Sequence, residues 1–166
     1  EYERLIYSEL RTIRQRAQIA PAAAAPPPAT EAAAIQFDYG RFAERFRDHP
    51  VSRFLDYHIA ELGEGRCVMT LQFRPEFDNS TGAVHGGILA MLADTAIACA
   101  LGTLFEEMNF ATANLNIHFL RKANTAVTAT AQIIKKGSKV CVGTCDIHGP
   151  KGELVATVIA DFVLHG

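Results

Sequence analysis

One long apolar stretch, residues 84–104, limits the folds open to this chain more than any other feature. It is apolar on nearly every side of a helix, with its large side chains at Ile88, Leu89, Met91, Leu92, Ile97 and Leu101. A helix that is apolar all round is buried, whereas a surface helix keeps one polar face. The chain has 166 residues, enough for one domain with a real core and a modest extension. We therefore expect a single domain built around this helix.

Segments with the alternating pattern of β-strands lie on both sides of the helical stretch. Two precede it, residues 54–61 and 66–73, and the glycine-rich turn at residues 63–65 joins them. Four follow it, at residues 110–120, 126–135, 139–148 and 154–164. Consecutive strands joined by tight turns pair antiparallel. The pattern predicts an α+β fold in which an antiparallel sheet wraps around one long buried central helix.

The N-terminal part of the chain differs in composition from the rest. Residues 1–19 carry apolar side chains spaced for one face of a helix, whose role is unknown. Residues 20–36 include a run of alanine and proline that favours extended chain, which predicts a linker. We expect the folded domain to span residues 37–166 and to open with a short amphipathic helix at 39–47, ended by His49-Pro50.

Charge and cysteine content argue against several classes of protein. The formal net charge of −2 lacks the basic field of a nucleic-acid-binding protein. The four cysteines form no CxxC pair or metal-ligand spacing, so we expect free core thiols and no metal site. No apolar stretch reaches the roughly 20 residues of a membrane helix, and the acidic start is unlike a signal peptide. We expect a cytoplasmic protein with no nucleic-acid partner and no membrane span.

The start of the long helix follows a loop of turn-forming residues and carries the pair Gly86-Gly87. A helix N-terminus offers unpaired backbone N–H groups and the positive end of a dipole. Glycine lets a substrate approach the backbone closely, so the site could hold a phosphate or polarise a carbonyl group. The alternative is that the two glycines only permit close packing at the start of the helix.

Asp94 is a carboxylate within the apolar helix, where burial without a partner is costly. It is either a functional group that faces a cavity or subunit interface, or a polar residue on an exposed edge of the helix. We favour function, because the helix is apolar on nearly every face and leaves no obvious exposed edge. Two nearby polar residues have ordinary alternatives: His85 as a helix cap and Asn79 as a turn residue.

Taken together, Asn79, the triplet His85-Gly86-Gly87 and Asp94, nine residues after His85, resemble the hot-dog-fold thioesterases. The resemblance is to the phenylacetate-degradation (PaaI-like) branch and extends over about residues 54–164. It implies the hot-dog fold and a homodimer or homotetramer whose active site is shared between subunits. It also implies hydrolysis of acyl-CoA thioesters, with no cofactor because coenzyme A is part of the substrate.

The same resemblance implies a role for each matching residue. Asp94 matches the catalytic carboxylate, which acts as nucleophile or as general base on water. The Gly86 N–H matches the donor that polarises the thioester carbonyl. Asn79 and His85 match residues that orient the thioester or the attacking water, and Thr112 matches a Ser or Thr that helps to hold water.

Further residues are expected to contact the substrate. Gly87 belongs to the glycine pair that lets the substrate approach the backbone. Relatives often have proline after Leu120-Arg121, whereas this chain has Lys122. The change adds a cation where the nucleotide end of coenzyme A tends to lie. We interpret the basic group as phosphate contacts, although each lysine alone is also typical of a solvated strand end; the group comprises Arg121, Lys122, Lys135, Lys136 and Lys139.

Two other functions deserve comparison with hydrolysis. A non-catalytic acyl-CoA sensor on the same fold would bind CoA esters without releasing thiol, yet it would not need to retain Asp94. A hot-dog hydratase would need an aspartate and a histidine acting together in a characteristic motif, and the sequence contains no such pairing. The pattern leaves open whether Asp94 attacks directly or activates water, and which acyl group is cleaved.

Overall fold

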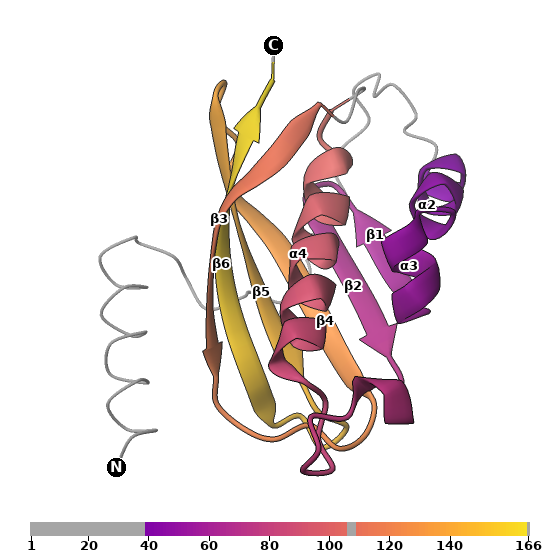
Figure 1. Ribbon diagram of the computed structural model, residues 1–166. Helices are drawn as coiled ribbons and strands as arrows, with labels where there is room; N and C mark the ends of the chain where they lie inside the picture. Colours follow the sequence, from indigo (N-terminus) through magenta and orange to yellow (C-terminus); the bar gives the residue numbers. More distant parts are fainter. Residues whose placement is uncertain (1–38, 106–108, 166) are drawn as a thin grey trace. The chain divides into compact units, whose positions relative to one another are not determined.

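The computed structural model describes residues 39–105 and 109–165, all within one compact unit, Asp38–Gly166 (Figure 1). The helix predicted at residues 1–19 and the linker predicted at 20–36 lie outside the described residues. The helices of this unit are α2 (Tyr39–Arg47), α3 (Pro50–Leu55) and α4 (Gly86–Gly102), with a short 3-10 helix, η1 (Pro75–Phe77). The strands are β1 (His58–Gly63), β2 (Arg66–Leu71), β3 (Phe110–Phe119), β4 (Val127–Lys135), β5 (Val140–His148) and β6 (Leu154–Leu164).

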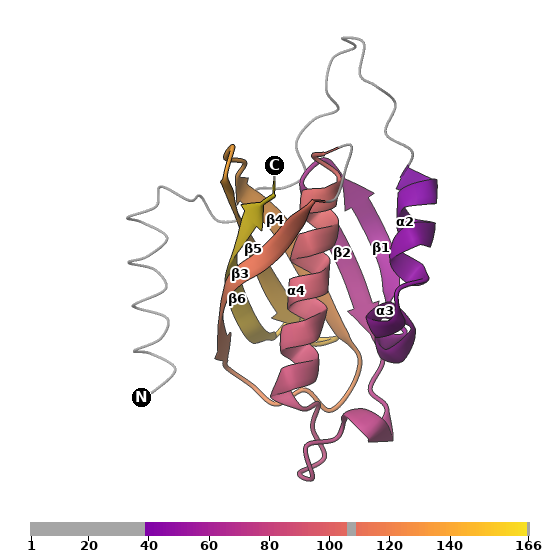
Figure 2. The same cartoon turned by 45° about the horizontal axis from the view of Figure 1, so that its top comes forward.

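The strands form one six-stranded sheet in the order β1-β2-β4-β5-β6-β3, and every neighbouring pair is antiparallel. Figure 1 and Figure 2 show the sheet curving around α4, with α2 and α3 beside β1. This arrangement confirms the predicted α+β fold with a sheet wrapped around one central helix. Among the described residues β3 pairs only with β6, so its other edge is unpaired.

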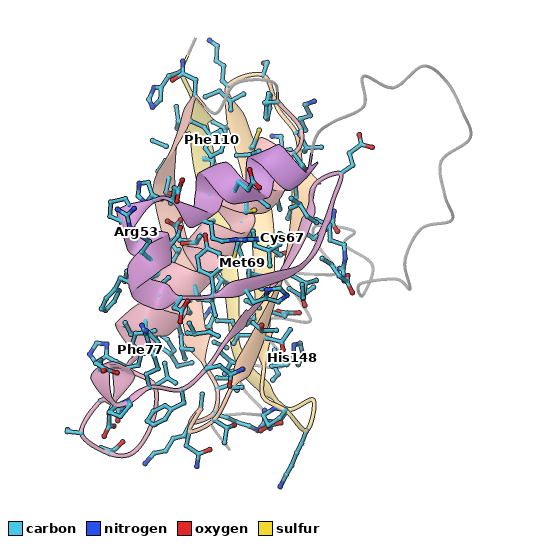
Figure 3. All side chains as sticks on the ribbon, turned by 90° about the vertical axis from the view of Figure 1, so that its right-hand side faces the viewer. Arg53, Cys67, Met69, Phe77, Phe110 and His148 are labelled. Atoms are coloured by element: carbon cyan, nitrogen blue, oxygen red, sulfur yellow. The ribbon has the colours of Figure 1, made fainter. Side chains whose placement is uncertain are left out.

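The core lies between α4 and the concave face of the sheet. Strand residues that point inward, such as Cys67 and Met69 of β2, are fully buried against the helix (Figure 3). Helix and sheet approach each other closely at Gly143 of β5, where an added Cβ would lie 2.3 Å from Cγ2 of Ile97. A glycine is needed there because the helix side chain occupies the space of a strand side chain.

The strand predicted at residues 54–61 is wrong at its start. Pro50 begins α3, with His49 extended before it, and the helix continues through Phe54 to Leu55. Proline suits the first turn of a helix because its missing N–H would have no acceptor there. Asp56, at φ 53°, ends the helix, and β1 begins only two residues later.

The cysteines behave as predicted. All four are free thiols and all are buried. Cys141 and Cys145 lie on the same, inward face of β5, as their spacing of four requires.

No helix in the described part of the chain has the length and apolarity needed to cross a membrane.

Candidate active site

The loop before α4 is held by two side-chain turns. The Asp78 carboxylate accepts hydrogen bonds from the Gly82 N–H at 2.9 Å and the Ala83 N–H at 3.2 Å. Oδ1 of Asn79 accepts from both the N–H and the hydroxyl of Thr81, at 3.0 and 2.7 Å. The side-chain oxygen of Asn79 is therefore used in the turn, which is the ordinary role considered for it.

Backbone hydrogen bonds fix the start of the helix on the rest of the domain. The Val84 N–H donates to the carbonyl of Ala123 at 2.6 Å, and the His85 N–H donates to the carbonyl of Phe77 at 2.7 Å. Phe77 is itself fully buried, and the Arg74 guanidinium lies 4.3 Å from the centre of its ring. Figure 3 places Phe77 toward the end of the molecule at which α4 begins. The first turn of α4 thus has a fixed position.

His85 caps the helix. Its Nδ1 accepts a hydrogen bond from the Gly87 N–H at 3.0 Å, while the side chain stays exposed. An accepting Nδ1 requires that the neutral ring carry its proton on Nε2, which is left as a donor toward solvent. The Gly87 N–H is occupied by this cap and is not offered to a substrate.

Gly86 is the first residue of α4, and it fits both interpretations of the glycine pair, a backbone donor for a substrate and a site of close packing. Its N–H has no acceptor among the residues that the structure describes, as expected for the first turn of a helix. A Cβ at this position would lie 2.9 Å from Cζ of Phe119, so the residue also permits close packing. The result is a free N–H donor with an aromatic ring beside it.

A cavity of about 420 Å³ opens next to this donor. Of the predicted site residues it brings together Asn79, Gly86, Arg121 and Lys122. Apolar side chains line the rest of it, from Ala83, Val84, Leu89, Phe119, Leu120 and Ala123. The combination of an apolar wall, two cationic side chains and a helix N-terminus suits an anionic ligand with an apolar part.

Asp94 lies elsewhere, on one half-buried face of α4 that also includes Ile88, Met91, Thr95 and Ala98. The sequence predicted a helix that is buried on every side, and this prediction is wrong for the face that carries Asp94. The carboxylate accepts a hydrogen bond from the Thr112 hydroxyl at 2.8 Å. Burial raises the pKa of Asp94 above its ordinary value, and the Thr112 hydrogen bond, which stabilises the charged form, lowers the pKa in part. A carboxylate with a raised pKa is a stronger base toward water.

A β-bulge in β3 brings Thr112 to Asp94. The inward-facing residues of the strand are Leu115, Ile117 and Phe119, and strict alternation would turn Thr112 outward. The register instead shifts between Thr112 and Asn114, so Thr112 pairs with the buried Phe162 and faces inward. No glycine or other break in the sequence marks this bulge, so the sequence did not predict it.

The structure separates the predicted residues into three places: the cavity at the start of α4, the Asp94–Thr112 contact along the helix, and the turn between β4 and β5. Asp94 is eight residues beyond Gly86 on the same helix, or about 12 Å along its axis, so the two do not meet within one chain. At the far end of α4, Lys136 donates to the carbonyl of Leu104 at 2.9 Å and lies over the ring of Phe105. Lys135 and Lys139 flank the same β4–β5 turn, away from the cavity with Arg121 and Lys122.

The described residues hold no group of three His, Cys, Asp or Glu side chains placed to bind a metal ion.

One residue of the cavity that the sequence did not indicate is Phe119. Its place in the alternation of β3 is that of an ordinary core side chain, and only the structure places its ring on Gly86.

Residues 81–156 match the family model of the thioesterase superfamily. The chain belongs to this superfamily and is a thioester hydrolase with the hot-dog fold. A candidate esterase of Halobacterium salinarum is 30% identical over 109 residues, covering 62% of this chain and 72% of that protein. The acyl-coenzyme A thioesterase PaaI of Escherichia coli is 29% identical over 113 residues, covering 67% of this chain and 79% of that protein.

Solved structures agree with this assignment. The Escherichia coli PaaI protein of the phenylacetic acid degradation operon superposes with a TM-score of 0.71 at 26% identity, covering 77% of this chain and 94% of that one. A candidate thioesterase of Ralstonia eutropha related to phenylacetic acid degradation gives a TM-score of 0.67 at 27% identity, covering 74% of this chain and 98% of that one. The predicted resemblance to the phenylacetate-degradation branch is confirmed.

Proposed function

We propose that this protein hydrolyses acyl-CoA thioesters, with the Gly86 N–H and the Asp94 carboxylate as its catalytic groups. The observation that carries the proposal is a base and a carbonyl-polarising donor on one helix, neither of which has a competing partner for its reactive role among the described residues. Within residues 39–105 and 109–165 the Gly86 N–H has no acceptor, and only one oxygen of the Asp94 carboxylate is bonded, to Thr112. The acyl-CoA substrate is supported by the Escherichia coli relative, which is named for that activity.

In the proposed reaction the thioester carbonyl oxygen accepts a hydrogen bond from the Gly86 N–H. The positive end of the α4 dipole stabilises negative charge that develops on this oxygen. Asp94 takes a proton from a water molecule while the water oxygen bonds to the carbonyl carbon. The carbon–sulfur bond then breaks, the thiolate of coenzyme A leaves and takes up a proton, and the free acid is released. Direct attack by the Asp94 carboxylate would pass instead through an acyl-enzyme anhydride.

The separation of Gly86 and Asp94 leads us to infer that two subunits form each site. The unpaired edge of β3 and the half-buried apolar face of α4 are surfaces that a second copy of the chain would cover. Thr112, which holds Asp94, lies on this edge strand. In such a homodimer the Asp94 of each chain would act with the Gly86 of its partner.

The cationic residues of the cavity give the coenzyme A part of the substrate a place to bind. Arg121 and Lys122 border the cavity and are exposed, so they can reach phosphate groups. Arg121 is also tied to the carbonyl of Leu154 at 2.9 Å, which limits its movement. Lys135, Lys136 and Lys139 would contribute only from the partner subunit, because they lie at the other end of α4.

The test is release of free thiol from a panel of aromatic, short-chain and long-chain acyl-CoA esters. Asp94→Asn should lower kcat by about 100-fold or more, the usual loss when a general base is removed. Thr95→Ala is the matched control, because Thr95 is the next residue on the same face and its hydroxyl donates to the Met91 carbonyl of its own helix, at 2.7 Å. Binding of CoA esters without thiol release by the unaltered chain would instead support a non-catalytic sensor.

A further inference from the structure

Phe119 is the most unusual apolar residue near the candidate site. It ends β3 and faces inward, yet its side chain remains 47% exposed. Three atoms of its ring, Cζ, Cε1 and Cε2, would lie 2.9, 3.1 and 3.4 Å from a Cβ on Gly86. The ring also lines the cavity beside Arg121 and Lys122. An exposed phenyl ring in this place covers one side of the first residue of α4.

Because the nitrogen of a residue is only two bonds from its Cβ, the ring that borders the Cβ position of Gly86 also borders its N–H. In a helix the Cα–Cβ direction tilts toward the N-terminus, and the N–H groups of the first turn point toward the same end. A carbonyl oxygen that accepts from Gly86 lies about 3 Å from its nitrogen. Both groups attached to that carbonyl carbon, the sulfur and the first carbon of the acyl chain, therefore lie on the side of the site that the Phe119 ring borders.

We infer that Phe119 is a specificity-determining residue that excludes acyl groups branched at the carbon next to the thioester carbonyl. This inference rests on the proposed function. A methyl branch on that carbon adds bulk one bond away from the carbonyl, where the ring leaves little space. A straight acyl chain can extend away from the ring and avoids the contact. The strand holds the backbone that carries the ring, because Phe119 pairs with the buried Ala156 of β6.

The experiment compares kcat/KM for butyryl-CoA and isobutyryl-CoA, which have the same atoms and differ only in the branch. Phe119→Ala should raise the ratio for the branched over the straight ester by about tenfold or more, since one misplaced methyl group is worth roughly 10- to 200-fold. Phe119→Trp should move the ratio in the opposite direction. Changes in the ratio between variants are independent of the intrinsic reactivity of the two esters.

The control is Phe54→Ala, which removes a phenyl ring of almost equal exposure, 48%, from α3. Phe54 packs on the ring of Phe77 and lines no part of the cavity, so the ratio should not change. Thermal unfolding of each variant verifies folding, and Phe119→Leu, which keeps an apolar side chain in the strand, replaces Phe119→Ala if the latter unfolds.

The outcomes separate this inference from the proposed function. Hydrolysis of both esters with a ratio that is the same in the unaltered chain, Phe119→Ala and Phe119→Trp overturns the role of Phe119 and leaves the thioesterase function intact. Absence of thiol release from every ester overturns the proposed function and this inference with it. Opposite shifts in Phe119→Ala and Phe119→Trp, with Phe54→Ala unchanged, support the assignment.

Discussion

Burial and the Thr112 hydroxyl act on the Asp94 carboxyl in opposite directions. Burial disfavours the charged form and raises the pKa, whereas the donated hydrogen bond favours the charged form and lowers it. In the proposed reaction, Thr112 therefore helps to set the pH above which Asp94 is available as a base. Since the hydroxyl also bonds to the carboxylate at 2.8 Å, it fixes the direction of the base as well.

Removing this hydroxyl should move the pH profile of the enzyme. In Thr112→Val the pKa of Asp94 rises further, because only burial remains, so the acidic limb of kcat/KM shifts to higher pH. Thr112→Ser keeps the hydroxyl and should keep the profile. The measurement is kcat/KM for one acyl-CoA ester across the acidic range, where this parameter reports the pKa of the free enzyme. An unshifted limb in Thr112→Val would show that Asp94 is not the group that titrates.

The raised pKa of Asp94 also has a consequence for stability. A carboxyl whose pKa is higher in the folded state than its ordinary value of 3.8 stabilises the fold below that pH, and this stabilisation is lost as pH rises through the folded-state pKa. Asparagine imitates the protonated form and keeps an oxygen for Thr112. Asp94→Asn should therefore be more stable than the unaltered chain at pH 7, with the difference shrinking toward pH 4.

Urea unfolding at fixed protein concentration measures this difference, because any self-association makes apparent stability depend on concentration. A difference that grows toward low pH would contradict the sign of the shift. The same experiment separates loss of activity from loss of structure in Asp94→Asn.

The sequence singled out Asp94 and Gly86 as candidates but could not predict which side chains lie beside them. A carboxylate in an apolar helix and a glycine at a helix start stand out in any single chain. The contact of Asp94 with Thr112 depends on the bulge in β3, and the contact of Gly86 with Phe119 depends on the register of β3 against β6. β3 and β6 are not consecutive in the chain, so no turn between them fixes their register, and the bulge has no residue in the sequence that marks it.

At the scale of elements, the fit of α4 into the sheet depends on glycine at one strand position. Gly143→Ala would place a methyl group 2.3 Å from Cγ2 of Ile97, which is fully buried and stiff. We expect a loss of about 1–3 kcal/mol in the free energy of unfolding, the usual cost of overpacking a core. Denaturant unfolding tests this.

Gly63→Ala is the matched control for that variant. Gly63 also lies in a strand, but no described residue lies within 4 Å of its Cβ position, so the change should stay within about 0.5 kcal/mol. Equal losses in the two variants would mean that strand glycines are needed for their backbone and not for the fit of α4.

Element type was more predictable than element ends. Hydrophobic periodicity identified α4 and every strand, because burial of one face imposes that pattern. It missed α3, where the six residues Pro50–Leu55 are too few to show a helical period. It also overestimated the burial of α4, because an apolar helix face that a single chain leaves half exposed has the same sequence pattern as a core face.

At the scale of the whole molecule, the proposed second subunit would cover that half-buried face and the edge of β3 that is unpaired among the described residues. If each site takes Gly86 from one chain and Asp94 from another, two differently inactivated chains should restore one site when mixed. Asp94→Asn removes the base. Gly86→Pro removes the N–H and suits the first turn of α4, since His85 before it is already extended, with φ −60° and ψ 136°. Phe119→Leu must accompany Gly86→Pro, because the proline ring needs the space that the Phe119 ring occupies.

Each of these chains alone should be inactive toward butyryl-CoA, whereas Phe119→Leu alone should be active. Refolding the two inactive chains together at equal amounts makes half of the dimers mixed, with one of two sites intact, so about a quarter of full activity should return. A site built within one chain would restore nothing, because every chain then carries its own defect. Activity that rises as the two chains are mixed, with neither active by itself, would therefore place Gly86 and Asp94 of one site on different subunits.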